Sequence, residues 1–197
     1  MKFKRNDLYS VIKISLFYSA VSLAFSLSSV FLPDKTIVNQ ISPGALNVYE
    51  IAGHFLWGVV AAVVTLRLKY ILLGGAFAVL IDSDHVINLL QTEGISRMSH
   101  SIAFAVIAVI IVMLVFGKRD YILGAIAGAS VLSHISYDLF VDDYTGFPLF
   151  APFNNISQHF APTSWIYFEI MAIIIVGIIT VLVRQKSLKE EKPSTER

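Results

Sequence analysis

The chain has 197 residues, of which 56% are hydrophobic and 15% charged, and its mean hydropathy is +0.71. This composition excludes an ordinary water-soluble domain and a disordered chain, because a surface in water must be covered largely by polar groups. The net charge of +1 is too small to attract nucleic acid. The absence of cysteine excludes disulfides, thiolate zinc sites and cysteine nucleophiles.

Six apolar runs predict an all-α, polytopic membrane protein with about six transmembrane helices. A helix needs about 20 apolar residues to cross a bilayer core of roughly 30 Å. Two of the runs are shorter, and we expect them to extend into flanking polar segments. For the second run, Ser42 and Pro43 are typical of a helix start upstream. In chain order the runs cover residues 10–32, 51–66, 70–90, 101–116, 121–141 and 165–183.

Small residues recur on one face of the first run, which we interpret as a retained anchor. The run is longer than the apolar part of a usual signal peptide and lacks a clear A-x-A cleavage site. Small residues at helical spacing let helices approach closely in lipid, and Gly124 and Gly128 in the fifth run predict the same. The serines of the first run are Ser15, Ser19, Ser22, Ser26 and Ser29.

The distribution of Lys and Arg predicts that both termini face the cytoplasm. With the N-terminus placed inside, all the basic residues except Lys35 and Arg97 fall on the cytoplasmic side. We therefore expect a multi-pass protein of the cytoplasmic membrane. Residues 1–183 would form a single transmembrane domain, and residues 184–197 a charged cytoplasmic tail without fixed structure.

Ionisable side chains occur inside the predicted spans, where they are costly, so a functional site is the default interpretation. Counting about 1.5 Å per residue from the cytoplasmic ends places them in one layer about 8 Å deep, in the outer half of the membrane. Packing histidines scattered at random would show no such agreement. The layer contains His54, Asp82, Asp84, His85, His100, His134 and Asp138.

This combination of side chains predicts a bound divalent metal. Imidazole and carboxylate ligands suit zinc, which we expect, and also manganese or iron. The predicted ligands are more numerous than one tetrahedral shell requires. The surplus would either orient the ligands through hydrogen bonds or bind a second ion. The predicted ligands are His54, Asp82, His85, His100, His134 and Asp138.

A metal-dependent hydrolase near the outer face is the leading interpretation, with an ester or phosphoester of an amphiphilic substrate as its target. A divalent ion activates a water and polarises an acyl or phosphoryl oxygen. Asp84 or Asp138 would accept the proton of that water. Arg97 would hold an anionic group of the substrate or anchor to a lipid headgroup. The apolar segment 147–153 would lie at the headgroup boundary, cover the site and admit a lipid-like substrate.

Two classes without hydrolase activity stay open. Buried His and Asp also build metal or proton transporters, and a structural metal would suit a membrane scaffold. A transporter needs polar residues that lead to the cytoplasm, and residues 70–80 and 121–132 contain no charge. Glu169 and His159 have no partner at helical spacing, and we expect them in a loop or at the interface.

The ordered motifs resemble those of the YdjM-like family of membrane-bound metal-dependent hydrolases. That family's H-x-x-x-G motif matches His54 and Gly58, and its L-P-D-x-D-H motif matches residues 80–85. Its H-R-G-x-T-H-S motif has its counterpart in residues 97–101, Arg-Met-Ser-His-Ser. Its H-x-x-x-D motif matches His134 and Asp138, and the threonine, glycine and proline that follow match Thr145, Gly146 and Pro152.

The resemblance implies a helical membrane fold and a metal-dependent hydrolase activity, and it covers about half of the chain. Three positions depart from the family's motifs. Ile81 replaces proline, Met98 replaces glycine, and Ser96 stands in place of the first histidine of the third motif. The chain therefore has one candidate ligand or supporting group fewer than the family pattern.

Overall fold

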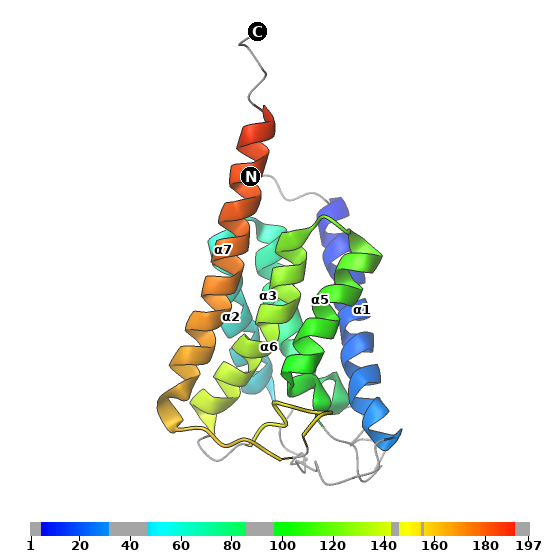
Figure 1. Cartoon of the computed structure of the whole chain (residues 1–197), viewed down its shortest axis with the longest axis vertical. Helices are drawn as coiled ribbons and strands as arrows, with labels where there is room; N and C mark the ends of the chain where they lie inside the picture. The colour runs from blue at the N-terminus through cyan, green and yellow to red at the C-terminus, as the bar shows by residue number, and fades with distance from the viewer. Residues whose placement is uncertain (1–4, 32–46, 86–96, 143–145, 155, 192–197) are drawn as a thin grey trace.

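The computed structural model describes residues 5–31, 47–85, 97–142, 146–154 and 156–191. Within these ranges the chain folds into a bundle of α-helices joined by turns and short 3-10 helices (Figure 1). The predicted all-α class is confirmed. The helices are α1 (Arg5–Leu27), α2 (Val48–Ala62), α3 (Leu68–Leu80), α5 (Ile102–Phe116), α6 (Tyr121–Val141) and α7 (Trp165–Glu191).

Four helical segments are long and apolar enough to cross a membrane, namely Arg5–Phe31, Val48–Thr65, Tyr121–Val141 and Pro162–Glu190. The outer surface of the bundle carries large apolar side chains such as Leu16 and Ile174, as a lipid-facing surface requires. Helix α5 is apolar but shorter, and α3 has 13 residues. The protein is therefore a helical membrane protein, while the count of six spans stays a prediction.

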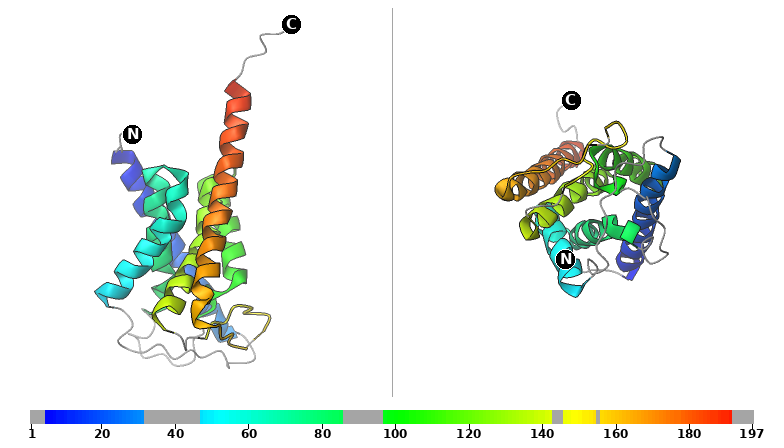
Figure 2. Two further views of the ribbon diagram at one scale, coloured as in Figure 1. Left: turned by 90° about the vertical axis from the view of Figure 1, so that its left-hand side faces the viewer. Right: turned by 90° about the horizontal axis from the view of Figure 1, so that it is seen from below.

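Helix α6 is the central element of the bundle. It packs against α2, α3, α5 and α7, and most of its residues are buried. In the end view of Figure 2 it lies between α7 on one side and α2 and α3 on the other. This central position explains why α6 can present functional side chains to several helices at once.

Helices α2 and α3 touch at two glycines. A Cβ atom at Gly58 would clash with the backbone oxygen of Gly74, and one at Gly74 would lie 2.6 Å from the oxygen of Gly58. The missing side chains let the two backbones come into contact. Since α2 carries His54 and α3 leads into Asp82, this contact sets the distance between two predicted ligands.

The helix starts and ends differ from the sequence prediction in three places. Helix α5 keeps to its apolar run, between the N-cap Ser101 and the C-cap Gly117, and does not extend into the flanking segments as we expected. Helix α2 begins at Val48, where the side chain of Asn47 accepts hydrogen bonds from two backbone N–H groups. It thus starts upstream of the apolar run, as expected, whereas the predicted start at Ser42 and Pro43 lies outside the described residues. Helix α3 ends at Leu80 instead of continuing to residue 90, and a 3-10 helix, η3 (Ile81–Asp84), follows it.

The third difference concerns the C-terminal tail. Helix α7 continues beyond Val183 to Glu191, so the first part of the predicted unstructured tail is helical. Residues 192–197 lie outside the part of the chain that is described. Helix α1 begins and α7 ends at the same end of the bundle (Figure 1). That arrangement fits termini on one side of a membrane, and the cytoplasmic orientation stays a prediction.

Candidate metal centre

Four elements bring the predicted ligands together at the end of the bundle opposite to the termini. Helix α2 supplies His54, and α6 supplies His134 and Asp138. The 3-10 helix η3 carries Asp82 and Asp84 and is followed by His85, and a second 3-10 helix, η4 (Met98–His100), ends in His100. We call six of these residues the His/Asp cluster, defined as His54, Asp82, His85, His100, His134 and Asp138.

Two carboxylates hold the cluster together. Asp82 Oδ1 lies 3.1 Å from Nε2 of His85, 3.3 Å from Nε2 of His100 and 3.4 Å from Nε2 of His134. On the opposite side, Asp138 Oδ1 lies 3.2 Å from Nε2 of His54. Residues that are far apart in the sequence therefore present nitrogen and oxygen atoms to one small, largely buried volume.

His134 directs a lone pair into this volume. Its Nδ1 lies 2.6 Å from the carbonyl oxygen of Ala78. A carbonyl only accepts hydrogen bonds, so Nδ1 carries the proton and Nε2 of the neutral ring carries the lone pair. This Nε2 lies 3.4 Å from Asp82 Oδ1 and 3.4 Å from Asp138 Oδ2. The backbone contact thus fixes the tautomer that a metal ligand needs.

His100 has the same arrangement. The hydroxyl of Ser99 donates to Asp84 Oδ2 at 3.1 Å, and its oxygen lies 3.1 Å from Nδ1 of His100. Because the hydroxyl proton is directed to the carboxylate, Nδ1 of His100 is the donor and Nε2 carries the lone pair. The Nε2 atoms of His100 and His134 are 2.8 Å apart. Two lone pairs and two carboxylates therefore converge, and a metal ion or a proton between them would relieve their repulsion.

Arg97 supplies part of the positive charge. Its guanidinium donates to Asp82 Oδ1 at 2.9 Å and lies 2.6 Å from Nε2 of His100. Burial lowers the pKa of Arg97, but the carboxylates of Asp82 and Asp138 raise it further, so the group stays charged. In this arrangement Arg97 is an internal counter-ion of the cluster. The sequence had suggested a substrate or headgroup contact.

The donor set fits a divalent ion. Asp82, Asp84 and Asp138 face the single guanidinium of Arg97, which leaves two negative charges without compensation when the histidines are neutral. Asp138 Oδ2 and Nε2 of His85 form no hydrogen bond of regular geometry among the residues described, although Asp138 Oδ2 lies 3.4 Å from Nε2 of His134 and Nε2 of His85 lies 3.1 Å from Asp82 Oδ1. Three overlapping groups could hold an ion: His54, His134 and Asp138; Asp82, His100 and His134; and Asp82, Asp84 and His85.

Sequence reasoning missed the role of the serines on α1. We interpreted them as small packing residues, but Ser26 donates to Asp84 Oδ2 at 3.0 Å and Ser22 donates to the backbone oxygen of Ile81 at 2.8 Å. These bonds attach α1 to the segment that carries Asp82 and His85. The spacing of the serines predicts that they share one face of the helix. It does not predict which residues of other helices they bind.

Glu169 and His159, which we expected in a loop or at the interface, lie in different environments. Glu169 is a buried residue of α7, with 7% of its surface exposed, so it does not lie in a loop, and its position at the membrane interface stays a prediction. His159 is exposed, in agreement with the prediction of a loop residue. Ser101 accepts a hydrogen bond from the backbone of Phe104, and it is therefore the N-cap of α5.

The apolar segment 147–153 lies over the cluster. The ring of Phe147 is fully buried and stacks with that of His100 at 6.4 Å between centroids. The carbonyl of Leu149 accepts a hydrogen bond from the backbone N–H of Ile102 at 2.9 Å. Phe153, by contrast, is 89% exposed. The segment therefore packs against His100 through Phe147 and presents the ring of Phe153 outward.

These features define a class: helical membrane proteins with a buried His/Asp cluster that could hold a metal ion. Residues 50–192 match the model of the YdjM inner membrane protein family. The chain belongs to that family. Comparisons with curated proteins and with solved structures give no match.

Proposed function

We propose that this protein is a metal-dependent hydrolase of the membrane, which cleaves an ester or phosphoester of an amphiphilic substrate near the outer face. The observation that carries the proposal is the convergence of the Nε2 lone pairs of His100 and His134 on two carboxylates. Groups that only accept hydrogen bonds are stable together when a cation binds among them.

His54, His134 and Asp138 are the first ligand set, because all three are buried and come from the two helices α2 and α6. Asp82, His100 and His134 form a second set that shares His134 with the first, and Asp82 and His85, with Asp84, form a third. Zinc is the expected metal, since the set contains imidazole and carboxylate and no thiolate. When bound, such an ion polarises an acyl or phosphoryl oxygen and makes water a nucleophile at neutral pH.

The protein's own groups would orient the substrate and move the proton. Asp138 Oδ2 forms no hydrogen bond of regular geometry in the described ranges, so it can take the proton of the attacking water. Asp84 is the other candidate base, although Ser26 and Ser99 already occupy its Oδ2. Arg97 lies 2.9 Å from Asp82 of the cluster, and its planar guanidinium could hold an anionic group of a substrate bound there.

Packing beneath the cluster favours hydrolysis over transport. Leu73 and Phe77 are fully buried, and the ring of Phe77 stacks on Tyr18 at 4.0 Å. These side chains fill the core between the cluster and the end of the bundle where the chain termini lie. A transport pathway would need ionisable groups there, and the buried polar residues on that side, such as Thr65 and Ser130, carry no charge. The orientation toward the outer face rests on the distribution of Lys and Arg.

The test combines elemental analysis with a substrate screen. Protein purified in mild detergent should contain at least one equivalent of a transition metal, and it should cleave a phosphorylated or acylated amphiphile only when loaded. Metal content near zero that does not rise when metal is added would contradict the metal site. A loaded protein that moves metal or protons across vesicles without hydrolysis would favour the transporter.

A further inference from the structure

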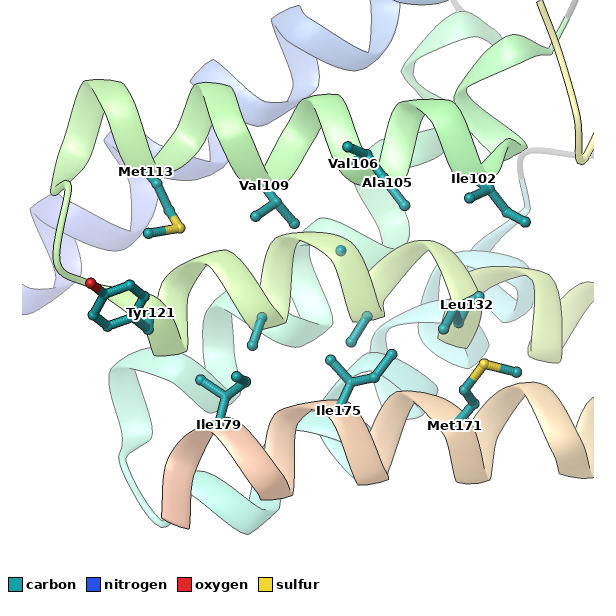
Figure 3. Close-up of a pocket in the computed structure, with 13 residues that line it drawn as sticks. Ile102, Ala105, Val106, Val109, Met113, Tyr121, Leu132, Met171, Ile175 and Ile179 are labelled. Carbon is teal, nitrogen blue, oxygen red and sulfur yellow. The ribbon is translucent and has the colours of Figure 1, made fainter. Parts of the chain in front are cut away.

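A buried carboxyl group lies between α6 and α7, outside the His/Asp cluster. Glu169 is the only charged side chain of α7 from Trp165 to Val183. Its two carboxyl oxygens form no hydrogen bond of regular geometry with the described residues. Further along the same helix, Met171 and Ile175 line an apolar groove against α5 and α6 (Figure 3). An ionised carboxylate without a partner is costly in such surroundings.

Two serines of α6 lie beside this carboxyl group. Glu169 faces the hydroxyls of Ser133 and Ser136, and both serines are fully buried. The hydroxyl of Ser136 donates to the carbonyl oxygen of Trp165 at 2.8 Å, and its oxygen accepts from Nε1 of Trp57 at 3.1 Å. The hydroxyl of Ser133 has no partner in the described ranges. We call these five residues the Glu169 junction.

Only a protonated carboxyl group satisfies the polar atoms of the junction. A neutral acid donates its O–H to the remaining lone pair of Ser136, and its carbonyl oxygen accepts from the hydroxyl of Ser133. An ionised carboxylate accepts from Ser133 alone, because the proton of Ser136 is already bound to Trp165. Its second oxygen and its charge then have no partner.

No basic side chain of the described residues compensates a negative Glu169. The elements that pack on α7 are α2, α6, η2 (Val63–Thr65) and η5 (Pro162–Ser164), and η2 and η5 contain no ionisable residue. None of the ionisable residues of α2 and α6 forms an ion pair with it. On α7 itself the first basic residue is Arg184, about 22 Å along the helix. The ionisable residues of α2 and α6 are Tyr49, Glu50, His54, Tyr121, His134, Tyr137 and Asp138.

The junction connects the two helices that carry the first ligand set. Trp57 follows His54 by three residues on α2, and Ser136 lies between His134 and Asp138 on α6. The hydrogen bond from Trp57 to Ser136 therefore joins α2 to α6 within one turn of all three ligands. The carboxyl group of α7 completes this connection from the other side of α6.

We infer that Glu169 is a positioning residue that binds a proton, and that the neutral acid keeps α2 and α6 at the spacing that metal binding requires. The inference rests on the proposed function and adds regulation by pH to it. When Glu169 loses its proton, its negative charge repels the oxygen of Ser136 and the junction loosens. Metal affinity should therefore be high while the proton is bound and should decrease as the pH rises.

Two variants separate the neutral acid from the carboxylate. Glu169→Gln keeps one donor and one acceptor in the same place, so it should bind metal at least as tightly as the unsubstituted protein. Glu169→Leu keeps neither and should weaken metal affinity about tenfold, as loss of supporting hydrogen bonds does. Thr180→Val is the matched control, because Thr180 is also a buried residue of α7 without a partner in the described ranges. Its affinity should be unchanged. Competition with a chelator at neutral pH provides the measurement.

A pH series tests the proton itself. The ratio of metal affinities, unsubstituted protein over Glu169→Gln, should fall between about pH 6 and pH 9, while the titration of the histidines cancels in the ratio. The two tryptophans of the chain, Trp57 and Trp165, both belong to the junction. Tryptophan fluorescence of the metal-free protein should therefore change over the same range, and it should stay constant in Glu169→Gln.

Three outcomes would overturn the inference. Equal weakening by Glu169→Gln and Glu169→Leu would show that a carboxylate is needed, as a ligand of a cation. Unchanged affinity in Glu169→Leu would show that the residue does not position the ligands. The same pH response in Glu169→Gln and in the unsubstituted protein would show that no proton binds at Glu169, and this comparison holds even when the leucine variant does not fold.

Failure of the proposed function would look different. A protein that binds no metal would contradict that function, whereas the fluorescence of the metal-free protein would still show whether Glu169 binds a proton. Conversely, metal binding and hydrolysis without a pH response specific to Glu169 would reject the inference and leave the proposed function in place.

Discussion

At the scale of single residues, the direction in which each imidazole is held matters most. Ala78 fixes His134 through a backbone carbonyl, and Ser99 fixes His100 through a hydroxyl that Asp84 holds. Both histidines therefore turn the same nitrogen toward the carboxylates. The cluster could hold a cation, because these two nitrogens are acceptors in the neutral rings.

Substitutions of His134 and Asp138 should distinguish a metal site from a pair of residues joined only by a structural hydrogen bond. His134→Ala should lose metal and hydrolysis together, because the variant lacks a ligand. Asp138→Asn preserves the shape but removes a charge and the proposed base. Its turnover should fall at least about tenfold, equivalent to about 1.4 kcal/mol of barrier. Metal content and turnover of both variants in detergent provide the measurement. Unchanged metal content with mild kinetics would identify a structural hydrogen bond.

Ser26 should influence the metal although it lies on another helix. Ser26→Ala removes a donor to Asp84 Oδ2, and loss of such supporting bonds typically weakens metal affinity about 10- to 100-fold. Ser22→Ala is the control, because Ser22 is equally buried but donates to the backbone oxygen of Ile81. Competition with a chelator measures both. Equal affinities for the two variants would show that Asp84 is remote from the metal.

At the scale of elements, the contact between α2 and α3 controls the distance between ligands. Gly58→Ala should destabilise the fold by about 1–3 kcal/mol, because the new methyl meets backbone that cannot rotate away. Gly177→Ala on α7 is the comparison, since no atom lies within 4 Å of its added Cβ. That change should be neutral or stabilise by about 0.5–1 kcal/mol. Reversible unfolding in detergent would show the difference, and similar values would mean that α2 can shift freely.

Sequence reasoning succeeded where the pattern lies within one element. The apolar runs located the helices, and the layer argument placed His54, Asp82 and His134 at a common depth because helical rise is constant. The end of α3 could not be read in the same way. Residues 81–84 contain no Gly or Pro that would mark a helix end, and the 3-10 turn that they form packs against α1 and η4.

The hydrogen bonds between different helices could not be predicted from the sequence either. Nothing in the spacing of Ser26 identifies Asp84 as its partner, and nothing around Arg97 distinguishes a counter-ion from a headgroup contact. The burial of Glu169 depends likewise on how α7 packs against α6. Such pairings follow from the packing angle of two helices, which single-helix periodicity does not determine.

At the scale of the whole molecule, the orientation in the membrane can be tested on this cysteine-free chain. Ile156→Cys lies at the end of the bundle that carries the cluster, and Lys118→Cys lies at the opposite end, both at exposed positions. An impermeant thiol reagent added to intact cells should label position 156 and spare position 118, because the basic residues favour the cytoplasmic side. The reverse pattern would move the site to the cytoplasm.

Helix α1 lies outside residues 50–192, the stretch that matches the family model, yet its Ser26 holds a carboxylate beside the cluster. The immediate surroundings of the metal centre are therefore divided between a shared body and a helix that precedes it. Exchange of α1 alone would retune the charge on Asp84 while every proposed ligand stays in place. A substitution on this helix can therefore change the reactivity of the site without changing any residue of the matched stretch.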